Sequence, residues 1–388
     1  MEYIKLSDIC DVRDGTHDSP KYVEEGFPLV TSKNIVDGEL DLSVVNYICQ
    51  EDYDKINTRS KVDAGDIIMP MIGTIGNPYV VKEFCDFAIK NVALIKFPNE
   101  DVNNKFVWYF LISPAFSRYI AEKNKGGTQK FLSLGDIRSI LIPKITIDEQ
   151  KEIVKKLDTV YSIIESRKKE ITMLDELIKA RFVEMFGNIH EDRFPKCKLR
   201  DVAHIKHGYA FSGEYFSDDD NGVVLVTPGN FALGGGFQEV RNRYFTSDYP
   251  DEYVLHAGDL IVTMTDLSKK VDTLGYGAIV PNSDKVYLHN QRIGLFDKLD
   301  SMLNPVFVRW FMQTDEYRLE IVRTSTGSTV HHTSPDRILD TVIYLPPIEM
   351  QNKFVSFAEQ VDKSKVVVQK SLEENQLLFD SLMQKYFG

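Results

Sequence analysis

The sequence predicts an α+β protein built by internal duplication. Two αβ domains are expected in tandem, joined by two long antiparallel coiled-coil helices with pseudo-twofold symmetry. Short motifs of the first half of the 388-residue chain return in the same order in the second half. Each half also closes with a long stretch of regular apolar spacing. The predicted boundaries are domains at 1–147 and 189–348, and helical regions at 148–188 and 349–388.

The duplication rests on a series of matches that keep their order. The separation between matched residues grows from 193 in the early matches to 201 from Val107 onward, so insertions fall only in the first part of each repeat. One such match is weak, but an ordered series indicates a repeat. The matched segments are Lys5–Ile9 with Lys198–Val202, Leu29–Asn34 with Leu225–Asn230, Ala64–Ile68 with Ala257–Ile261, Val107–Phe110 with Val308–Phe311, Gly126–Thr128 with Gly327–Thr329, Glu149–Gln150 with Met350–Gln351, and Phe186–Gly187 with Phe387–Gly388.

The first part of each repeat consists of short apolar runs separated by Gly, Pro, Asn and Asp, a pattern typical of strands. Examples are Phe27–Thr31, Asp66–Met69, Val223–Thr227 and Asp259–Met264. A helical stretch is then expected in each repeat, followed by a strand that ends at proline. These lie at Lys105–Lys123 and Ser139–Pro143 in the first repeat, and at Pro305–Thr324 and Thr341–Pro347 in the second.

Each repeat ends in a predicted long helix, because apolar residues recur there about every 3.5 positions, as in a coiled-coil seam. A lone helix of this kind would leave an apolar stripe in water, so the two helices are expected to pair. They serve either as scaffold alone or also as a ruler between the domains. The second seam is weaker, with Lys365 and Asn375 inside it. The pairing residues are Ile153, Leu157, Val160, Ile164, Ile171, Leu174 and Ile178 in the first helix, and Phe354, Val361, Val368, Leu372, Phe379 and Leu382 in the second.

Composition places the chain among globular proteins, with 43% apolar and 27% charged residues. No apolar run reaches the ~18–20 residues of a membrane span, and the N-terminus lacks the pattern of a secretory signal. The four cysteines show no C-x-x-C pairing, which favours a reducing cytoplasm. The net charge of −12 argues against a simple electrostatic binder of nucleic acid.

The sequence offers no credible catalytic centre, and we expect neither a metal nor a cofactor. It contains no phosphate-binding loop, no H-E-x-x-H and no G-x-S-x-G motif. The adjacent pair His331-His332 lies in a Ser/Thr-rich loop, where neighbouring residues rarely both bind a metal. Asn77-Pro78-Tyr79 resembles part of the Asn-Pro-Pro-Tyr box of adenine methyltransferases but lacks the second proline, and we interpret it as a turn.

Taken together, these motifs resemble the specificity subunit of type I restriction–modification systems, over the whole chain. No single motif is specific, whereas their order, duplication and length are. The marks are the Lys-Leu-x-Asp starts, Ala-Gly-Asp before an apolar strand, Gly73–Gly76, Gly208–Phe211, Met264–Ser268, the Gly-Thr and Ser-Thr loops, and the helix starts Asp148–Gln150 and Glu349–Gln351.

The resemblance implies a subunit without chemistry of its own, within a complex that methylates adenine and cleaves DNA with ATP. Each of its two target recognition domains would read one half of a bipartite, asymmetric site in double-stranded DNA. The helices would set the spacing and dock two methyltransferase subunits, and two restriction subunits would be further partners. A different class of protein remains open, namely a duplicated structural adaptor that bridges two protein subunits without reading DNA.

The candidate DNA contacts are loop residues at matching places of the two repeats, chosen for side chains that pair with bases or phosphates. In the first domain they are Arg13, His17, Lys33, Asn34, Thr74, Asn77, Lys90, Asn91, Thr128, Gln129 and Lys130. In the second they are His207, Tyr209, Ser212, Thr227, Asn230, Thr265, Lys269, Lys270, Asn290, Gln291, Arg292, Thr329, His331 and His332.

The acidic charge is spread over both domains, with −4 in residues 1–147 (17 basic, 21 acidic) and −6 in residues 189–348 (16 basic, 22 acidic). Since phosphate neutralisation supplies much of the affinity for DNA, we expect the chain alone to bind DNA weakly. Tight binding would then require the methyltransferase subunits.

Overall fold

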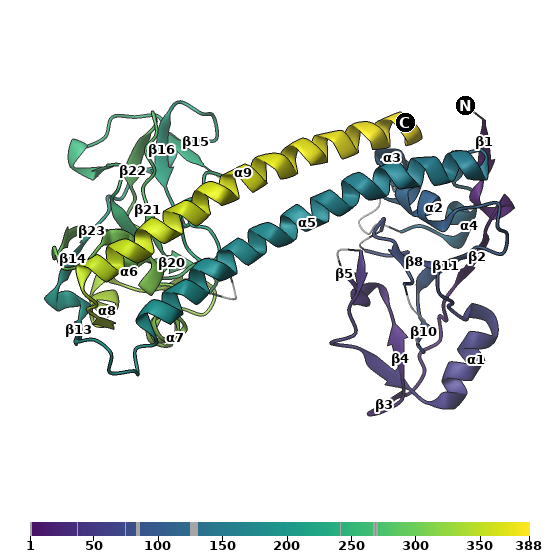
Figure 1. The fold of residues 1–388 in the computed structure, drawn as a ribbon, viewed down its shortest axis with the longest axis horizontal. Coiled ribbons are helices and arrows are strands. Elements are labelled where there is room, and N and C mark those ends of the chain that lie inside the picture. The colour runs from purple at the N-terminus through teal and green to yellow at the C-terminus, as the bar shows by residue number, and fades with distance from the viewer. Residues whose placement is uncertain are drawn as a thin grey trace. The chain divides into compact units, whose positions relative to one another are not determined.

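The computed structural model describes residues 2–36, 38–73, 75–82, 86–124, 131–240, 242–266, 268 and 271–388. The chain divides into two compact units (Figure 1). Unit 1 comprises Met1–Glu170 with Val368–Gly388, and unit 2 comprises Ile171–Val367. The boundaries fall inside the two long helices, so each unit contains a part of both helices.

Unit 1 contains two four-stranded sheets among its described residues, with strand orders β2-β11-β8-β9 and β10-β4-β7-β3. Two short ladders, β1-β12 and β5-β6, lie beside them. The strands are β1 Tyr3–Lys5, β2 Asp11–Asp14, β3 Tyr22–Val23, β4 Phe27–Val30, β5 Ile35–Val36, β6 Glu39–Leu40, β7 Asn46–Ile48, β8 Ile67–Pro70, β9 Tyr79–Val80, β10 Ala88–Ile89, β11 Val92–Lys96 and β12 Leu141–Pro143. The helices are α1 Gln50–Ser60, α2 Asn104–Leu111, α3 Pro114–Lys123, α4 Leu134–Arg138 and the first part of α5 Ile147–Phe186.

Unit 2 repeats this plan over its described residues, with a four-stranded sheet β14-β23-β19-β21 and a five-stranded sheet β15-β17-β16-β22-β18. The ladders β13-β25 and β20-β24 accompany them. The strands are β13 Lys196–Lys198, β14 Ala203–His207, β15 Phe216–Ser217, β16 Val223–Val226, β17 Arg243–Phe245, β18 Val254–Leu255, β19 Leu260–Thr263, β20 Thr265–Asp266, β21 Gly277–Ile279, β22 Val286–His289, β23 Ile293–Leu299, β24 His331–His332 and β25 Val342–Tyr344. The helices are α6 Pro305–Phe311, α7 Asp315–Thr324, α8 Pro335–Leu339 and α9 Ile348–Phe387.

The predicted duplication and α+β class are confirmed by this shared topology. The antiparallel sheet β2-β11-β8-β9 of unit 1 has its counterpart in β14-β23-β19-β21 of unit 2. In both units a second sheet contains one parallel pair, β4 with β10 and β16 with β22. The predicted strands lie within a residue or two of β4, β8, β16 and β19.

The helical stretch expected in each repeat is in fact two helices. In unit 1, α2 ends at Leu111 and α3 begins at Pro114, where Ser113 caps the new helix by accepting a hydrogen bond from the Phe116 amide. Proline at the first helical position cannot continue the preceding helix, because it has no amide hydrogen to donate. In unit 2, α6 and α7 are also separate helices that meet around Thr314, although α7 begins with Asp315 and the Thr314 side chain makes no capping hydrogen bond.

Helix α1 was not expected from the sequence, where the region was interpreted as short β-rich runs. Its sequence is strongly polar, and its apolar face is limited to Tyr53 and Ile56, which pack against a small core. The remaining signal was the placement of charge, with Glu51 and Asp52 in the first turn and Arg59 in the last. That arrangement opposes the partial charges at the two ends of a helix and stabilises it.

The repeated Ala-Gly-Asp motif is a tight turn before a buried strand. Gly65 and Gly258 have φ angles of +89° and +92°, in the left-handed region that favours glycine. In each turn the aspartate accepts a hydrogen bond from the amide three residues earlier, Asp63 to Asp66 and His256 to Asp259, both at 2.8 Å. The motif is therefore a structural signature of the duplication.

The long helices α5 and α9 pair in antiparallel fashion within each unit (Figure 1). In unit 1 the first part of α5, with Leu157 fully buried, packs with the last part of α9, where Phe387 is 4% exposed. In unit 2 the last part of α5, including Phe186, packs with the first part of α9, where Phe354 is fully buried. Both ends of the helix pair thus complete the main core of the unit in which they lie.

Most of the predicted pairing residues lie in or against these cores. Ile171 and Val368 are not in either main core, and Val368 is buried nonetheless. The polar seam position Lys365 has a partner, since its Nζ lies 2.5 Å from Asp175 Oδ1 within unit 2. Those in the cores or packed against them are Ile153, Leu157, Val160, Ile164, Leu174, Ile178, Phe354, Val361, Leu372, Phe379 and Leu382.

A buried glutamine ties the start of each long helix to its domain. Gln351 is completely buried; its Oε1 accepts from the Asn304 amide at 2.9 Å. Its Nε2 donates to the carbonyls of Met302 and Pro346, both at 2.8 Å. Gln150 makes the equivalent bonds in unit 1, to Asn103, Asp101 and Ile145. The repeated glutamine of the helix start is therefore a structural residue.

We predict that Gln351→Ala lowers the free energy of unfolding by about 2–4 kcal/mol, because it leaves buried backbone groups without a hydrogen-bond partner. Urea unfolding followed by circular dichroism measures the change. The control is Gln360→Ala, which alters an exposed side chain of the same helix and should change stability by no more than about 0.5 kcal/mol. Equal effects of the two substitutions would contradict the structural role of Gln351.

Candidate nucleic-acid interface

In unit 1, antiparallel pairing brings three loops to one edge of a sheet. Asp14, the last residue of β2, pairs with Ala93 of β11, and Pro70, the last residue of β8, pairs with Val92. The segments that follow β2 and β8 therefore leave the sheet where β11 begins. We call this edge of unit 1, with residues 15–20, 71–73, 75–78 and 90–91, the first loop edge. Of the seven sequence-predicted contacts of unit 1 that the structure describes, four lie on it, namely His17, Asn77, Lys90 and Asn91.

Unit 2 has the equivalent edge. His207 of β14 pairs with Gly294, and Thr263 of β19 pairs with Ile293, both at the start of β23. The second loop edge accordingly comprises residues 207–212, 264–266, 268, 271–273 and 290–292. The sequence had pointed to segments of this kind by their chemistry and by their matching places in the two repeats, and the sheet register explains why they come together.

On the first loop edge, His17 lies between two acceptors. Its Nδ1 is 2.9 Å from Asn91 Oδ1, and its Nε2 is 2.8 Å from Asp14 Oδ2. Thr16 and Lys90 form a parallel bridge that joins the two loops, and Lys90 Nζ donates to Ser19 at 2.8 Å. His17, Lys90 and Asn91 are therefore held in one cluster.

Both ring nitrogens of His17 face oxygen atoms, an arrangement that suits the protonated imidazolium, which can donate from both. The hydrogen bond with Asn91, followed by that with Asp14, raises the pKa of His17 above its usual 6.5. Stability from this shift is present in full below pH 6.5 and is lost as the pH rises through the raised pKa. The imidazole can thus offer donors or carry charge near neutral pH.

Two arginines flank the cluster. Arg13 forms an ion pair with Asp11 at 2.6 Å, and its Nη1 donates to the carbonyl of Arg59 at 2.8 Å. Arg59 in turn makes a short ion pair with Asp14, the carboxylate that also holds His17. Sequence reasoning missed Arg59 because it missed α1, and the cation in the last turn of that helix was the one available signal.

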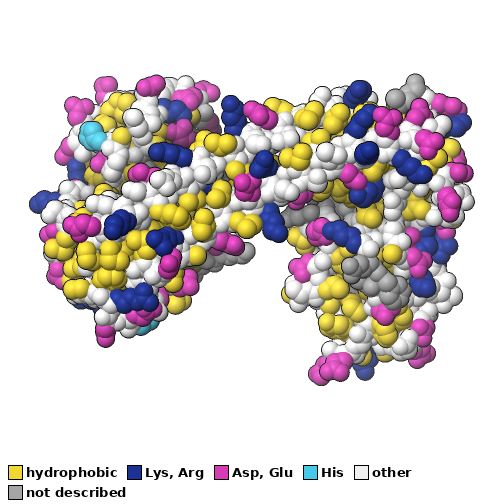
Figure 2. Space-filling model, in the orientation of Figure 1, with side chains coloured by type: hydrophobic (Ala, Val, Ile, Leu, Met, Phe, Trp, Pro, Cys, Tyr) yellow, Lys and Arg dark blue, Asp and Glu magenta, His cyan; other side chains and the backbone are white. Residues whose placement is uncertain are grey.

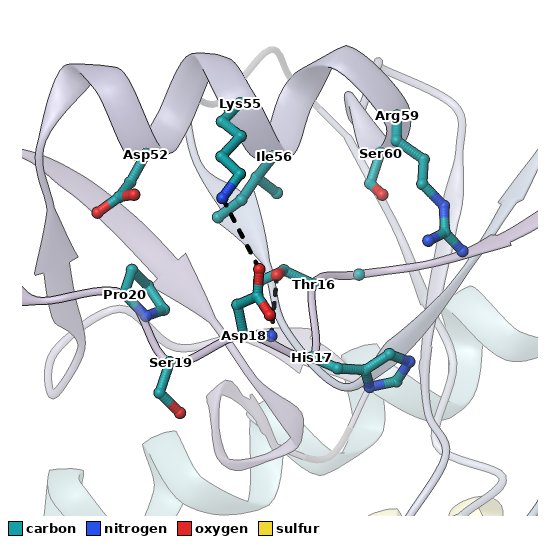
Figure 3. A pocket seen from close by; sticks show the side chains of 11 residues that line it. Thr16, His17, Asp18, Ser19, Pro20, Asp52, Lys55, Ile56, Arg59 and Ser60 are labelled. Atoms are coloured by element: carbon teal, nitrogen blue, oxygen red, sulfur yellow. Dashed lines mark hydrogen bonds and ion pairs between the residues drawn. The ribbon is translucent and has the colours of Figure 1, made fainter.

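A cavity of about 510 Å³ opens between residues 15–20 and the face of α1 (Figure 3). Lys55 points from the helix toward Asp18, with Nζ 3.9 Å from its carboxylate, and Thr16 accepts from the Asp18 amide at 3.1 Å. Asp52 also lines the cavity. Cations and carboxylates alternate here, so the cavity does not favour a phosphate in the way that a purely basic pocket would.

On the second loop edge, Tyr209 forms a parallel bridge with Asn290, equivalent to the bridge between Thr16 and Lys90. The amide of Gln291 donates to the Tyr209 carbonyl at 2.9 Å. The side chains of Gln291 and Arg292 are exposed. Asn290 is buried, and its Oδ1 accepts from the Arg292 amide at 3.0 Å, which fixes the turn. The turn thus exposes two neighbouring polar side chains to solvent, the amide of Gln291 and the guanidinium of Arg292.

A second pair of loops continues this edge. The Met264 amide donates to the Arg292 carbonyl at 2.9 Å, and β20 then pairs with β24 at Thr265 and His332. Thr265 is buried, with its Oγ1 3.2 Å from His332 Nδ1. His331 is half-buried and His332 is exposed. The two histidines therefore lie in a strand bridge on the same edge.

Asp266 organises the loop that follows. Its carboxylate accepts hydrogen bonds from the amides of Ser268, Thr273 and Leu274, and from the Thr273 hydroxyl. Burial alone would raise the pKa of Asp266, but these hydrogen bonds outweigh it, so the pKa lies below its usual value. The carboxylate thus fixes the backbone at Ser268, Thr273 and Leu274 and is not free for a ligand.

The repeated Thr-Asn motifs cap two short 3₁₀ helices, Ser32–Asn34 and Pro228–Asn230. The Asn34 side chain accepts from the amide and hydroxyl of Thr31 at 3.0 Å each, and donates to two backbone carbonyls. Asn230 is completely buried and bonds Thr227 in the same way. Since both amides are satisfied inside the protein, we do not carry Asn34, Asn230 or Thr227 into the proposed interface. Thr265 and Asn290 are omitted because they are buried.

The other candidates have varied surroundings. Asn77 is half-buried and its Nδ2 lies 3.4 Å from the Ile35 carbonyl, and Ser212 donates to Glu214 at 3.2 Å. Lys33, His207 and Thr329 are exposed. Thr74, Thr128, Gln129, Lys130, Lys269 and Lys270 lie outside the described residues.

Within the part of the chain that the structure describes, no group of three His, Cys, Asp or Glu side chains has an arrangement that could hold a metal ion. The described helices also include none that is long and apolar enough to cross a membrane.

The family model described as "Type I restriction modification DNA specificity domain" matches residues 1–174 and 192–377. The chain belongs to this family. It is 29% identical over 150 residues to the specificity subunit of the type I restriction enzyme EcoBI of Escherichia coli, a match that covers 38% of this chain and 31% of that protein. It is 24% identical to the MjaVIII specificity subunit of Methanocaldococcus jannaschii over 380 residues, covering 92% of this chain and 81% of the other.

Solved structures share the fold. The type I restriction–modification S subunit from M. genitalium superposes with a TM-score of 0.57 and 13% identity, covering all of this chain and 96% of the other. A chain from a structure on complex assembly and conformational transition of the type I system gives a TM-score of 0.56 with 16% identity, covering all of this chain and 97% of the other.

We predict that Asn91→Gly lowers the pKa of His17 toward its usual value, because it removes the acceptor of the Nδ1 hydrogen bond. Glycine is chosen because Asn91 has a φ of +55°, where alanine would be strained. An NMR titration of the histidine side chains measures the pKa. The control, Asn99→Ala, changes an exposed asparagine away from this cluster; an unchanged titration of His17 in Asn91→Gly would contradict the assignment.

Proposed function

We propose that this chain reads DNA for a type I restriction–modification complex, with each unit recognising one half of a bipartite, asymmetric target. The observation that carries the proposal is the equivalence of the two loop edges. In both units, side chains suited to bases and phosphates leave the same edge of an equivalent antiparallel sheet. A pair of such edges on one chain suits a target with two halves.

The proposed base contacts are exposed or half-buried polar side chains on these edges or on the strands and loops beside them. In the major groove, arginine and lysine pair with guanine, and asparagine and glutamine pair with adenine. In unit 1 the proposed contacts are Arg13, His17, Lys33, Asn77, Lys90 and Asn91, and in unit 2 they are His207, Tyr209, Ser212, Gln291, Arg292, Thr329, His331 and His332. Lys90 and Asn91 would contact one half-site, and Gln291 and Arg292 would contact the other. Because these side chains differ, we expect the two half-sites to differ in sequence.

We further propose that methyltransferase subunits dock on the paired helices. Large apolar side chains remain exposed there, which is unusual for a surface helix without a partner (Figure 2). Each unit presents the start of one long helix beside the end of the other, so two copies of one methyltransferase would find similar surfaces. Restriction subunits would join this complex in the cytoplasm. The exposed residues are Ile163, Leu377 and Leu378 in unit 1, and Met173, Leu177, Val183, Val366 and Val367 in unit 2.

The structural adaptor that would not read DNA has less support. It accounts for the duplication, the paired helices and the acidic charge equally well. It does not account for polar and aromatic side chains gathered on equivalent loop edges, and the matching family is described as a DNA specificity domain.

A methylation map tests the proposal. The chain is co-expressed with its candidate methyltransferase, and adenine methylation is mapped across the genome with and without the chain. We expect a split motif that depends on the chain. Arg292→Ala should relax specificity in one half of that motif only, because a bidentate contact to guanine contributes about 1–3 kcal/mol of discrimination.

The matched variant Lys90→Ala should affect only the other half of the motif. A chain-dependent motif in which each variant alters both halves would contradict the assignment of one half-site to each unit. A stable complex that methylates no new motif would favour the adaptor.

The acidic charge generates a further prediction. With a net charge of −12, the isolated chain should bind its target at least about tenfold more weakly than the complex with methyltransferase subunits at ~150 mM salt. Fluorescence anisotropy with a labelled duplex measures both affinities, and a duplex with a scrambled half-site is the control. Equal affinities would show that the methyltransferase subunits are not needed for tight binding.

A further inference from the structure

Tyr209 is an exposed aromatic residue at the centre of the second loop edge. It is 43% exposed, and it directly follows Gly208 at the end of β14. A Cβ added to Gly208 would lie 2.1 Å from the Asn290 carbonyl oxygen, so only glycine allows this approach of the loop to the turn. The close approach places the Tyr209 backbone within one hydrogen bond of Gln291, a proposed base-reading residue.

The Tyr209 ring is supported from the protein side. Its centroid lies 5.0 Å from that of Phe211 and 5.1 Å from that of Tyr253. Tyr253 is itself held by Lys206, whose Nζ lies 4.4 Å from its ring centroid. Edge-on and tilted packing of this kind holds a ring in one orientation. An aromatic ring fixed in advance loses little conformational entropy when it binds a ligand.

The fold does not require an aromatic residue at this position. In unit 1 the equivalent residue is Thr16, which makes the same parallel bridge, with Lys90. Because the same backbone arrangement forms around threonine, the exposed ring of Tyr209 is a feature of unit 2 alone. The ring lies beside the turn that carries Gln291 and Arg292. The molecule that contacts its exposed face should therefore be the same DNA that this turn contacts.

We propose that Tyr209 stacks on a nucleobase of the half-site read by unit 2, at a base step that opens on binding. This inference rests on the proposed function and adds a mode of recognition to it. Every base has a π face, and stacking on an aromatic side chain requires that base to separate from its neighbour. Pyrimidine–purine steps open most easily, so we expect the stacked base of the unit 2 half-site to lie at such a step.

The test uses the complex of the full chain with its methyltransferase subunits and a duplex that carries the mapped target. Each thymine or cytosine of the half-site is replaced in turn by its 5-iodo derivative, which crosslinks under light to a stacked aromatic ring. Each adenine or guanine of the half-site is replaced in the same way by its photoreactive 8-bromo derivative, so the two series together cover every base. Mass spectrometry identifies the crosslinked peptide, and anisotropy gives the affinity.

We compare three variants with the wild type. Tyr209→Thr installs the residue of the equivalent position in unit 1, and Tyr209→Phe keeps the ring without its hydroxyl. Tyr215→Ala is the matched control, because Tyr215 is 41% exposed but packs against Phe245 of β17. In the strand order of the sheet, β17 is separated from β22, and hence from the turn, by β16.

We expect a crosslink from one base pair to the peptide that contains Tyr209, retained in Tyr209→Phe and in Tyr215→Ala. Tyr209→Thr should lose the crosslink and bind the target about ten- to a hundredfold more weakly, with unchanged thermal unfolding. Specific binding without such a crosslink would overturn the stacking and leave the proposed function intact. The stacking is also overturned if Tyr209→Phe weakens binding as much as Tyr209→Thr. A wild-type complex that does not distinguish target from scrambled duplex would overturn both.

Discussion

Each unit of this protein depends on the burial of one end of α5 against one end of α9. In unit 1, Phe379, Met383 and Phe387 from the end of the chain lie in the same core as residues from the first domain. In unit 2, Ile178 and Phe182 from the middle of the chain fill the equivalent place. A long amphipathic helix gains most of its stability from tertiary packing, so neither repeat completes its core with its own helix alone. Folding of the two units is thereby linked through the helices that they share.

The same constraint explains why the glutamine at the start of each long helix is repeated, whereas the loops at the sheet edges differ. Gln150 and Gln351 each satisfy buried backbone groups at the junction of helix and domain, and a buried polar group without a partner is costly. The loops at the sheet edge carry no such requirement. Thr16 and Tyr209 occupy equivalent backbone positions with unrelated chemistry. The scaffold therefore holds the edge in place while the side chains on it are free to diverge, which is what a reader of two different half-sites needs.

Some of the acidic residues also have a structural role, because they hold neighbouring cations in place. On the first loop edge, Asp14 holds both His17 and Arg59, and Asp18 lies opposite Lys55. Carboxylates here orient the cations and partly neutralise them. Such an edge holds its side chains in a fixed geometry for recognition but attracts phosphate only weakly. Non-specific affinity for DNA requires positive charge that is not neutralised by neighbouring carboxylates. This arrangement is consistent with a complex in which partner subunits supply most of the attraction for the DNA backbone.

The sequence alone determined the duplication, the strand-rich domains and the long paired helices, because these follow from motif order and from apolar periodicity. It also selected the loops of the candidate interface. It could not distinguish Asn34 and Asn230, whose amides are consumed by helix caps, from Gln291 and Arg292, whose side chains face solvent. Nor could it find α1 and Arg59, because a polar helix with only two apolar residues on its inner face gives almost no periodic signal. Tertiary structure decided these points, since hydrogen-bond partners and exposure depend on which segments the sheet register brings together.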